Sequence, residues 1–167
     1  VLFRSSVRTQ WYRALGENLV LGLSGALGSG GGYSNDGQLP FYKNFFAGGV
    51  SSVRGYVAGS LGPRTAAESG GDPLGGRQRV LANANLYLPV PGLENGKNTR
   101  LSIFMDVGQV YGDPEPILFS GLRASAGVAF NWFTAIGPLA LSYGVPLNSE
   151  PSDRTRKFQI TLGTLFR

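Results

Sequence analysis

Apolar and polar side chains alternate along much of this 167-residue chain with a period of two. In the last stretch, one face of an extended strand would carry large apolar side chains and the other small or polar ones. The apolar positions are Phe158, Ile160, Leu162 and Phe166, and the opposite ones are Gln159, Thr161 and Gly163. Since successive side chains of a β-strand point to opposite faces, the pattern predicts an all-β protein.

Seven segments are predicted to be strands. They are residues 7–15, 18–28, 78–89, 99–111, 122–132, 139–147 and 158–166. Most are about ten residues long, the length that a tilted strand needs to cross the hydrocarbon layer. An apolar face opposite a small or polar one indicates an antiparallel transmembrane β-barrel with a polar lumen. A soluble β-sandwich also alternates, but the strand lengths and the aromatic residues near strand ends, such as Trp11 and Trp132, favour the barrel.

The region of about residues 30–77 is a long connection, rich in Gly and Pro, of the kind that is normally functional or disordered. Seven strands are too few for a closed bacterial barrel, which has an even number and at least eight. We therefore expect the other strands to precede Val1, and residues 6–167 to form the C-terminal part of a larger barrel. Residues 1–5 match the translation of a common sequencing adapter, so we expect them to be an artefact without function.

The composition excludes several kinds of catalytic and metal-binding site. Only 15% of the residues are charged, and there is no Cys and no His, which removes thiolate metal sites, thiol nucleophiles and imidazole bases. The net charge is +5, but Arg and Lys are scattered singly, which argues against nucleic acid as a partner. The glycine-rich residues 28–32 lack the Lys-Ser/Thr of a phosphate-binding loop, and we expect a flexible loop tip there. We expect no enzyme activity, no metal and no cofactor.

Three motifs carry a resemblance to a known family. The long loop contains Leu39-Pro40-Phe41-Tyr42-Lys43-Asn44-Phe45-Phe46-Ala47-Gly48-Gly49, Ser52-Val53-Arg54-Gly55-Tyr56 and Leu61-Gly62-Pro63. A later strand has Phe104, Asp106 and Gly108 at alternate positions, and the chain ends on the alternating run from Phe158 through Gly163 to Phe166, followed by Arg167. These resemble the sixth extracellular loop of the BamA superfamily, with its Val-Arg-Gly-Phe/Tyr hallmark, its Phe-x-Asp-x-Gly strand and its terminal β-signal.

The resemblance covers residues 7–167 and implies the final seven strands of a sixteen-stranded barrel. It also implies that the loop folds back into the barrel, where Arg54 reaches Asp106. Asp106 on the lipid face would be costly, so we expect it to face the lumen and find a cation. The alternative is an ordinary surface loop and an Asp in a turn. Some relatives carry a second acid on the preceding strand; here that region has Asn85 and Tyr87, which could supply neutral hydrogen bonds.

The function that the resemblance implies is an insertase subunit that folds β-barrel proteins and inserts them into the outer membrane of a Gram-negative bacterium. The terminal strand would then border a lateral gate, although Gly163 is also compatible with a short last strand. The implied partners are outer-membrane lipid and lipopolysaccharide, unfolded outer-membrane proteins, and lipoproteins of the assembly machinery, which would bind mainly through missing N-terminal domains. Alternatives are an autotransporter-assembly or two-partner secretion relative, or a passive barrel such as a porin.

Overall fold

The computed structural model describes residues 2–32, 40–66, 71–90, 98–112, 117, 119–135 and 137–163. The long strands are β1 (Leu2–Ala14), β2 (Val20–Gly32), β4 (Gln78–Leu88), β5 (Thr99–Tyr111), β6 (Arg123–Thr134), β7 (Gly137–Pro146) and β9 (Phe158–Leu162). The shorter elements are β3 (Gly55–Tyr56), β8 (Thr155–Arg156) and the 3-10 turns η1 (Phe41–Lys43) and η4 (Phe119–Gly121). Among the described residues, no helix has the length and apolarity needed to cross a membrane.

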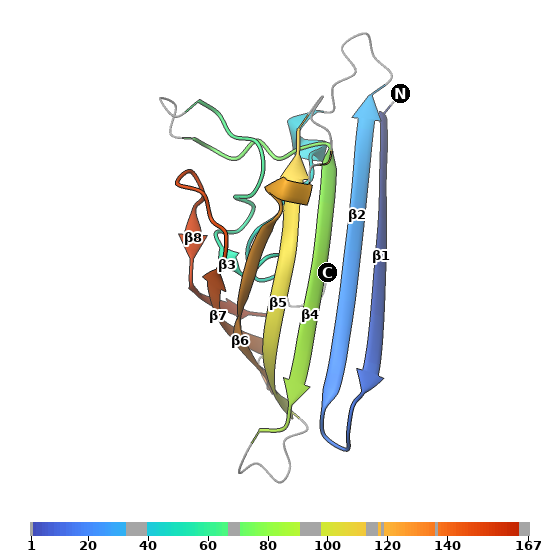
Figure 1. Cartoon of the computed structure of the whole chain (residues 1–167), viewed down its shortest axis with the longest axis vertical. Helices are drawn as coiled ribbons and strands as arrows, with labels where there is room; N and C mark the ends of the chain where they lie inside the picture. The colour runs from blue at the N-terminus through green and yellow to red at the C-terminus, as the bar shows by residue number, and fades with distance from the viewer. Residues whose placement is uncertain are drawn as a thin grey trace.

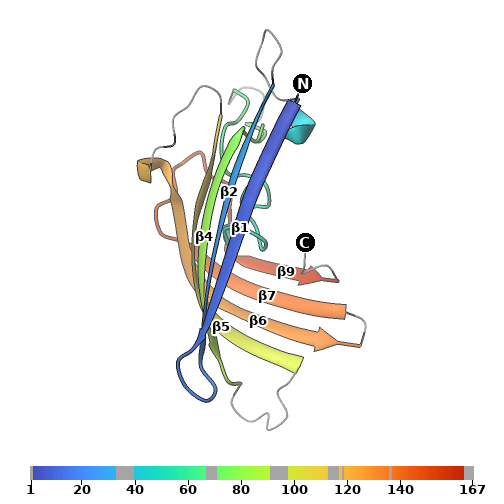
Figure 2. The same cartoon turned by 90° about the vertical axis from the view of Figure 1, so that its right-hand side faces the viewer.

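The seven long strands form one antiparallel sheet in the order β1-β2-β4-β5-β6-β7-β9. β1 and β2 run along the long axis of the molecule, whereas β6, β7 and β9 cross it (Figure 2). This change of direction is the accumulated right-handed twist of neighbouring strands. Within the described residues the sheet is open, with β1 and β9 at its edges. The docked loop, defined here as residues 40–66 and 71–77, lies on the concave side of the sheet (Figure 1).

The seven predicted strands are all present, with corrections at their ends. β1 begins at Leu2 rather than at residue 7, and the origin of residues 1–5 stays a prediction. β9 ends at Leu162. The described residues do not include Leu39, Phe166 or Arg167, so what was predicted for these positions lies outside them. The two-residue strands β3 and β8, which pair with each other, were not predicted, because a strand of two residues is too short to show a periodic pattern.

The prediction of a flexible loop tip at residues 28–32 is wrong, because these residues complete β2. Their glycines allow close packing. A Cβ on Gly28 would lie 2.6 Å from Cε1 of Phe45, and a Cβ on Gly31 would lie 2.7 Å from Nη2 of Arg77. Because Gly28 and Gly31 of β2 have no side chain, the side chains of Phe45 and Arg77 can pack against the strand at these positions.

The two faces of the sheet differ as the alternation predicted. The convex face exposes large apolar side chains: Val7, Trp11, Leu23, Leu27, Ile103, Met105, Val128, Trp132, Tyr143, Val145, Phe158, Ile160 and Leu162. The concave face buries polar side chains: Ser102, Asp106, Ser125, Ser142 and Gln159. An apolar outer face and a polar inner face are the arrangement of a membrane barrel wall.

The apolar core lies between the docked loop and the concave face. Its members from the sheet are Ala26 on β2, Leu81 on β4 and Val110 on β5. Those from the loop are Ala47, Val53, Tyr56 and Leu61, each no more than 2% exposed. Burying these side chains against the wall removes apolar surface from water, so the hydrophobic effect holds the loop inside the curve of the sheet.

Candidate functional site

The Val-Arg-Gly-Tyr turn of the docked loop meets the sheet at β5. Nε and Nη2 of Arg54 each lie 2.7 Å from an oxygen of Asp106, and the Arg54 backbone N–H donates to the same carboxylate at 3.0 Å. The Asp106 side chain is completely buried, and that of Arg54 is 12% exposed. A two-pronged guanidinium–carboxylate contact fixes orientation as well as charge. The contact predicted between Arg54 and Asp106 is therefore present, and it lies on the concave face.

Neutral side chains from β4 complete the surroundings of this ion pair. Oδ1 of Asn85 accepts from Nη2 of Arg54 at 2.8 Å. Nδ2 of Asn83 donates to Oδ1 of Asp106 at 2.9 Å and to the Ser52 carbonyl at 2.6 Å. Asn85 thus acts as the neutral partner considered from the sequence. Asn83 was missed, although it shares a face with Asn85 and lies opposite Asp106 in the β4–β5 register.

The aromatic ring of Phe104 packs against one face of the Arg54 guanidinium. Cζ of Arg54 lies 3.6 Å from the centroid of the Phe104 ring, and Phe104 is 2% exposed. A cation over an aromatic face is attracted by the negative charge of the ring's π-system, and the attraction grows when water is excluded. Phe104 and Asp106 therefore both hold Arg54, which gives a physical reason for finding them two residues apart on one strand.

Glycines permit the loop to approach the wall this closely. Gly55 has a φ of +90°, a backbone conformation that favours Gly. A Cβ on Gly144 of β7 would lie 2.9 Å from the Gly55 nitrogen, and a Cβ on Gly108 of β5 would lie 3.0 Å from Cγ2 of Val53. The expected role of Gly55 in a sharp turn beside the wall thus has its counterpart in Gly144, which the sequence did not single out.

The next residue of the turn, Tyr56, pairs with Thr155 in the segment between β7 and β9, and its side chain reaches β6. Tyr56 is completely buried, and its hydroxyl donates to the Ala124 carbonyl at 3.3 Å. Burial, and secondly the charge of Asp153, raise the pKa of Tyr56 to about 12, so the hydroxyl stays a neutral donor. Asp153 is itself bound by Arg123 of β6, with Nε and Oδ2 2.6 Å apart. This second ion pair attaches residues 147–157 to the sheet.

The terminal strand is short. β9 pairs with β7 over five residues, from Leu139↔Leu162 to Tyr143↔Phe158, and its Phe158, Ile160 and Leu162 are exposed on the convex face. Gly163 follows with a φ of +100°, which ends the extended conformation. The described part of the predicted terminal signal therefore forms the edge strand of the sheet.

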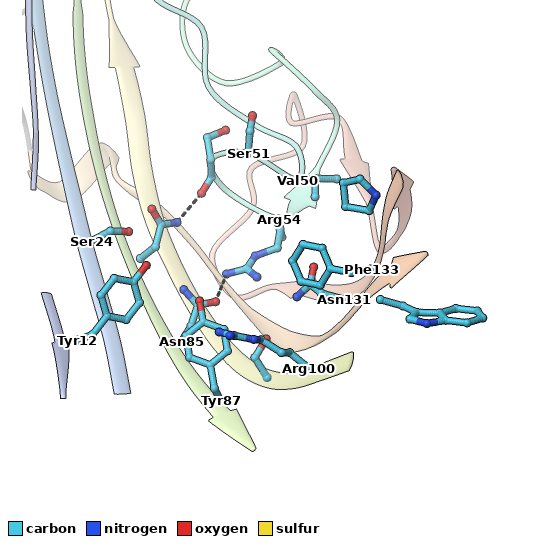
Figure 3. A pocket seen from close by; sticks show the side chains of 15 residues that line it. Tyr12, Ser24, Val50, Ser51, Arg54, Asn85, Tyr87, Arg100, Asn131 and Phe133 are labelled. Atoms are coloured by element: carbon cyan, nitrogen blue, oxygen red, sulfur yellow. Dashed lines mark hydrogen bonds between the residues drawn. The ribbon is translucent and has the colours of Figure 1, made fainter. Parts of the chain in front are cut away.

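A cavity of about 470 Å³ lies beside the Arg54 side chain, on the concave side (Figure 3). Its lining includes Arg54, Asn85, Tyr12, Tyr87 and Arg100, whose side chains come from the loop and from strands β1, β4 and β5. Tyr87, the second neutral candidate named from the sequence, thus lines this cavity. In the part of the chain that the structure describes, no three acidic side chains are grouped to hold a metal ion. The lining combines charged and amide groups with aromatic rings, such as those of Tyr12, Tyr87 and Phe133, so the cavity is of mixed polar and apolar character.

Comparisons with known proteins agree with this geometry. The outer membrane protein assembly factor BamA of Neisseria meningitidis serogroup B is 35% identical over 181 residues, which cover 93% of this chain and 23% of the relative. BamA of Nitratidesulfovibrio vulgaris is 28% identical, covering 96% and 20%, and a SAM50-like protein of Schizosaccharomyces pombe is 26% identical, covering 74% and 26%. The crystal structure of BamA from Haemophilus ducreyi lacking POTRA domains 1–3 matches with a TM-score of 0.85 at 28% identity, over 95% of this chain and 34% of that chain.

This chain therefore spans about a quarter or less of the length of these curated relatives. The structural match confirms the fold class, an antiparallel β-barrel wall, while the number of strands in the whole barrel stays a prediction. The relatives also confirm the predicted location, the outer membrane of a Gram-negative bacterium. A family model described as the Omp85 superfamily domain matches residues 2–166, so the chain belongs to the Omp85 superfamily.

Proposed function

We propose that this chain is the loop-bearing and gate-bearing part of an insertase that folds β-barrel proteins and inserts them into the outer membrane. It acts as an assembly factor without chemical catalysis and without a cofactor. Its substrates are unfolded outer-membrane proteins, its surroundings are outer-membrane lipid and lipopolysaccharide, and its companions are lipoproteins of the assembly machinery. The proposal is supported by the relatives named as outer membrane protein assembly factors over 93% and 96% of this chain.

The observation that carries the proposal is the docking of the Val53–Tyr56 turn on the inner wall. A buried ion pair, two asparagines and an aromatic ring hold this turn in one place on the wall. A machine that must open and close needs its lumenal loop in one defined place. In our proposal, the Arg54–Asp106 pair keeps the wall and the loop in the working arrangement.

The terminal strand supplies the working edge. Five paired residues hold β9 to β7, compared with ten between β6 and β7. An edge strand presents unpaired backbone N–H and C=O groups, which can template the addition of another strand. We propose that an incoming strand of the substrate pairs with the edge at Phe158–Leu162, and that the break at Gly163 keeps this edge from closing tightly.

A chimera tests the proposed function. This chain would replace the matching segment of the Neisseria meningitidis BamA in a strain in which the native protein can be depleted. We expect the chimera to restore growth and normal levels of folded porins, and the Asp106→Ala chimera to fail. Asp72→Ala is a matched control, because Asp72 is 74% exposed and its ion pair with Arg154 is long, at 3.5 Å.

The outcomes separate the alternatives. Restored porin levels with the Asp106→Ala chimera, at wild-type amounts of protein, would contradict the role given to the docked loop. A chimera that folds in the outer membrane, as judged by heat-modifiable migration, but does not restore porins would favour an autotransporter-assembly or secretion relative. Steady ion conduction by that folded chimera in planar bilayers, again without restoration, would favour a passive barrel.

A further inference from the structure

We propose that Gln159 is a positioning residue that ties the terminal strand to the docked loop, so that opening of the β9 edge and loosening of the loop are coupled. Gln159 is the one side chain of β9 that is buried, at 7% exposure. Its Nε2 donates to the carbonyl of Tyr56 at 2.6 Å, across 103 positions of sequence. The hydrogen bond joins the residue that ends the Val-Arg-Gly-Tyr turn to the strand at the edge of the sheet.

This bond completes a set of contacts that one turn makes with the last strands. Arg54 binds Asp106 on β5, Gly55 approaches Gly144 on β7, and the Tyr56 hydroxyl donates to Ala124 on β6. Gln159 adds β9. Between them, three consecutive loop residues therefore contact the strands β5, β6, β7 and β9. A displacement of any one of these strands would change a contact of the turn.

Backbone hydrogen bonds also connect the docked loop to the segment that leads into β9. β3 pairs with β8 through Gly55↔Arg156 and Tyr56↔Thr155, and the Val57 N–H donates to the Arg154 carbonyl at 2.9 Å. On the other side, the Gly144 N–H donates to the Lys157 carbonyl at 2.8 Å. The chain leading into β9 is thus held by the loop on one side and by β7 on the other.

The chemistry of the Gln159 contact makes it releasable. Only one half of the amide is bound, because Oε1 is buried without a hydrogen-bond partner among the described groups. Its register neighbour on β7, Ser142, has a buried Oγ in the same condition. The Gln159 contact is a single hydrogen bond between neutral groups, whereas Arg54 and Asp106 share two hydrogen bonds between opposite charges, which are the stronger kind. The tie is therefore weaker than the ion pair at Asp106, and it is the part of the network that can open first.

The consequence rests on the proposed function, in which the edge at β9 opens to receive a substrate strand. For β9 to leave β7, either Gln159 releases Tyr56 or β9 pulls the turn with it. The position of the docked turn therefore depends on whether the edge is open, and the Arg54–Asp106 pair stays in place while β9 moves.

Hydrogen exchange measured by mass spectrometry on the chimera in lipid nanodiscs tests the tie without any assembly assay. The test variant is Gln159→Leu, which keeps the volume and removes the donor, and Thr161→Val is the control on the same face of the same strand. We expect Gln159→Leu to speed exchange about tenfold both in β9 and in the loop amides of residues 49–61, whose acceptors lie largely within the loop. Thr161→Val should leave the loop amides unchanged.

Several results would overturn the proposal. Faster exchange confined to β9 would mean that Gln159 only stabilises its own strand, and unchanged exchange would mean that it ties nothing. If the Leu variant does not fold, the same criteria apply to Gln159→Met, which keeps the length of the side chain and has no hydrogen-bond donor. Because exchange is independent of porin assembly, a positive result in a chimera that fails to restore porins would support the tie and count against the proposed function.

Combining variants separates coupling from a local effect. In an Asp106→Asn background, where the loop is already loosened, adding Gln159→Leu should change loop exchange little further. Additive effects of the two substitutions on the loop amides would show that Gln159 acts independently of the docked turn, contrary to the proposal.

Discussion

At one edge of the sheet, β1 and β2 pair along all thirteen residues of each strand, whereas at the other edge β7 and β9 pair over five. The long β1–β2 ladder is held by its own backbone hydrogen bonds. The short β7–β9 ladder is supplemented by the docked loop, through β3, β8 and Gln159. Both edges contact the docked loop, since Arg4 of β1 lies over the ring of Phe45, but only the β9 edge combines this support with a ladder of five residue pairs in place of thirteen. Stability at the β9 edge therefore depends more strongly on the docked loop than stability at the β1 edge does.

Removing the anion of the docking pair should have the largest effect on this contrast. Asp106→Ala leaves Arg54 buried without its counter-charge, which costs about 3–5 kcal/mol for a buried pair that loses one partner. We expect the docked loop and the β9 edge to lose protection from hydrogen exchange, while β1 and β2 keep theirs. Urea unfolding in lipid vesicles measures the loss of stability, and an equal loss of protection at both edges would contradict the stronger dependence of the β9 edge on the docked loop.

A charge on the lipid face of β2 should act at the opposite edge. Leu27 is paired with Val7 on the convex face, toward the middle of the β1–β2 ladder, and Leu27→Lys should cost about 2–4 kcal/mol, the cost of a cation near the bilayer midplane. Ser24 of the same strand lines the lumenal cavity, so Ser24→Lys is the matched control and should be nearly neutral. Refolding into vesicles at graded urea concentrations gives both values. Similar costs for the two variants would contradict the assignment of faces.

A methyl group between the loop and β7 should have an intermediate effect. In Gly144→Ala, the new Cβ would lie 2.9 Å from the Gly55 nitrogen and 3.1 Å from the Arg54 carbonyl carbon, so backbone must shift. We expect a loss of about 1–3 kcal/mol, typical of overpacking, measured by the temperature at which heat-modifiable migration is lost. Gly25→Ala is the control, because its Cβ would make ordinary contacts at 3.6 Å or more.

The smallest effect is expected from the ring beneath Arg54. Phe104→Leu keeps an apolar side chain but removes the cation–π contact, so the docking of the loop should weaken by about 1 kcal/mol beyond the loss of packing. Exchange of the loop amides should rise modestly, and that of β1 and β2 should not. Phe130→Leu on the opposite face of β6 controls for the loss of ring volume, and an equal rise in that variant would contradict the role of Phe104.

The ion pair of the site could be predicted from the sequence, but most of the residues that contact the docked turn could not. Arg54 and Asp106 were paired by a motif and by the cost of an acid in lipid, and the structure has them in contact. Asn83, Gly144 and Gln159 carried no comparable signal, because polar or small residues are expected at every second position of a lumenal face. Their importance depends on which loop atom lies opposite them, and that is set by the folded loop.

Arg54 was named as the partner of Asp106 by the family resemblance, whereas the pattern of residues predicted the seven strands, the face that each turns to lipid, and the need of Asp106 for a cation. It could do so because strand period and the cost of burying a charge act on residues one at a time or in neighbouring pairs. The tertiary structure decided that β2 continues through its glycines to Gly32, that the turn at Gly55 touches β7, and that Gln159 reaches Tyr56. The last of these contacts joins residues 103 positions apart, and only the curvature of the whole sheet brings such residues together.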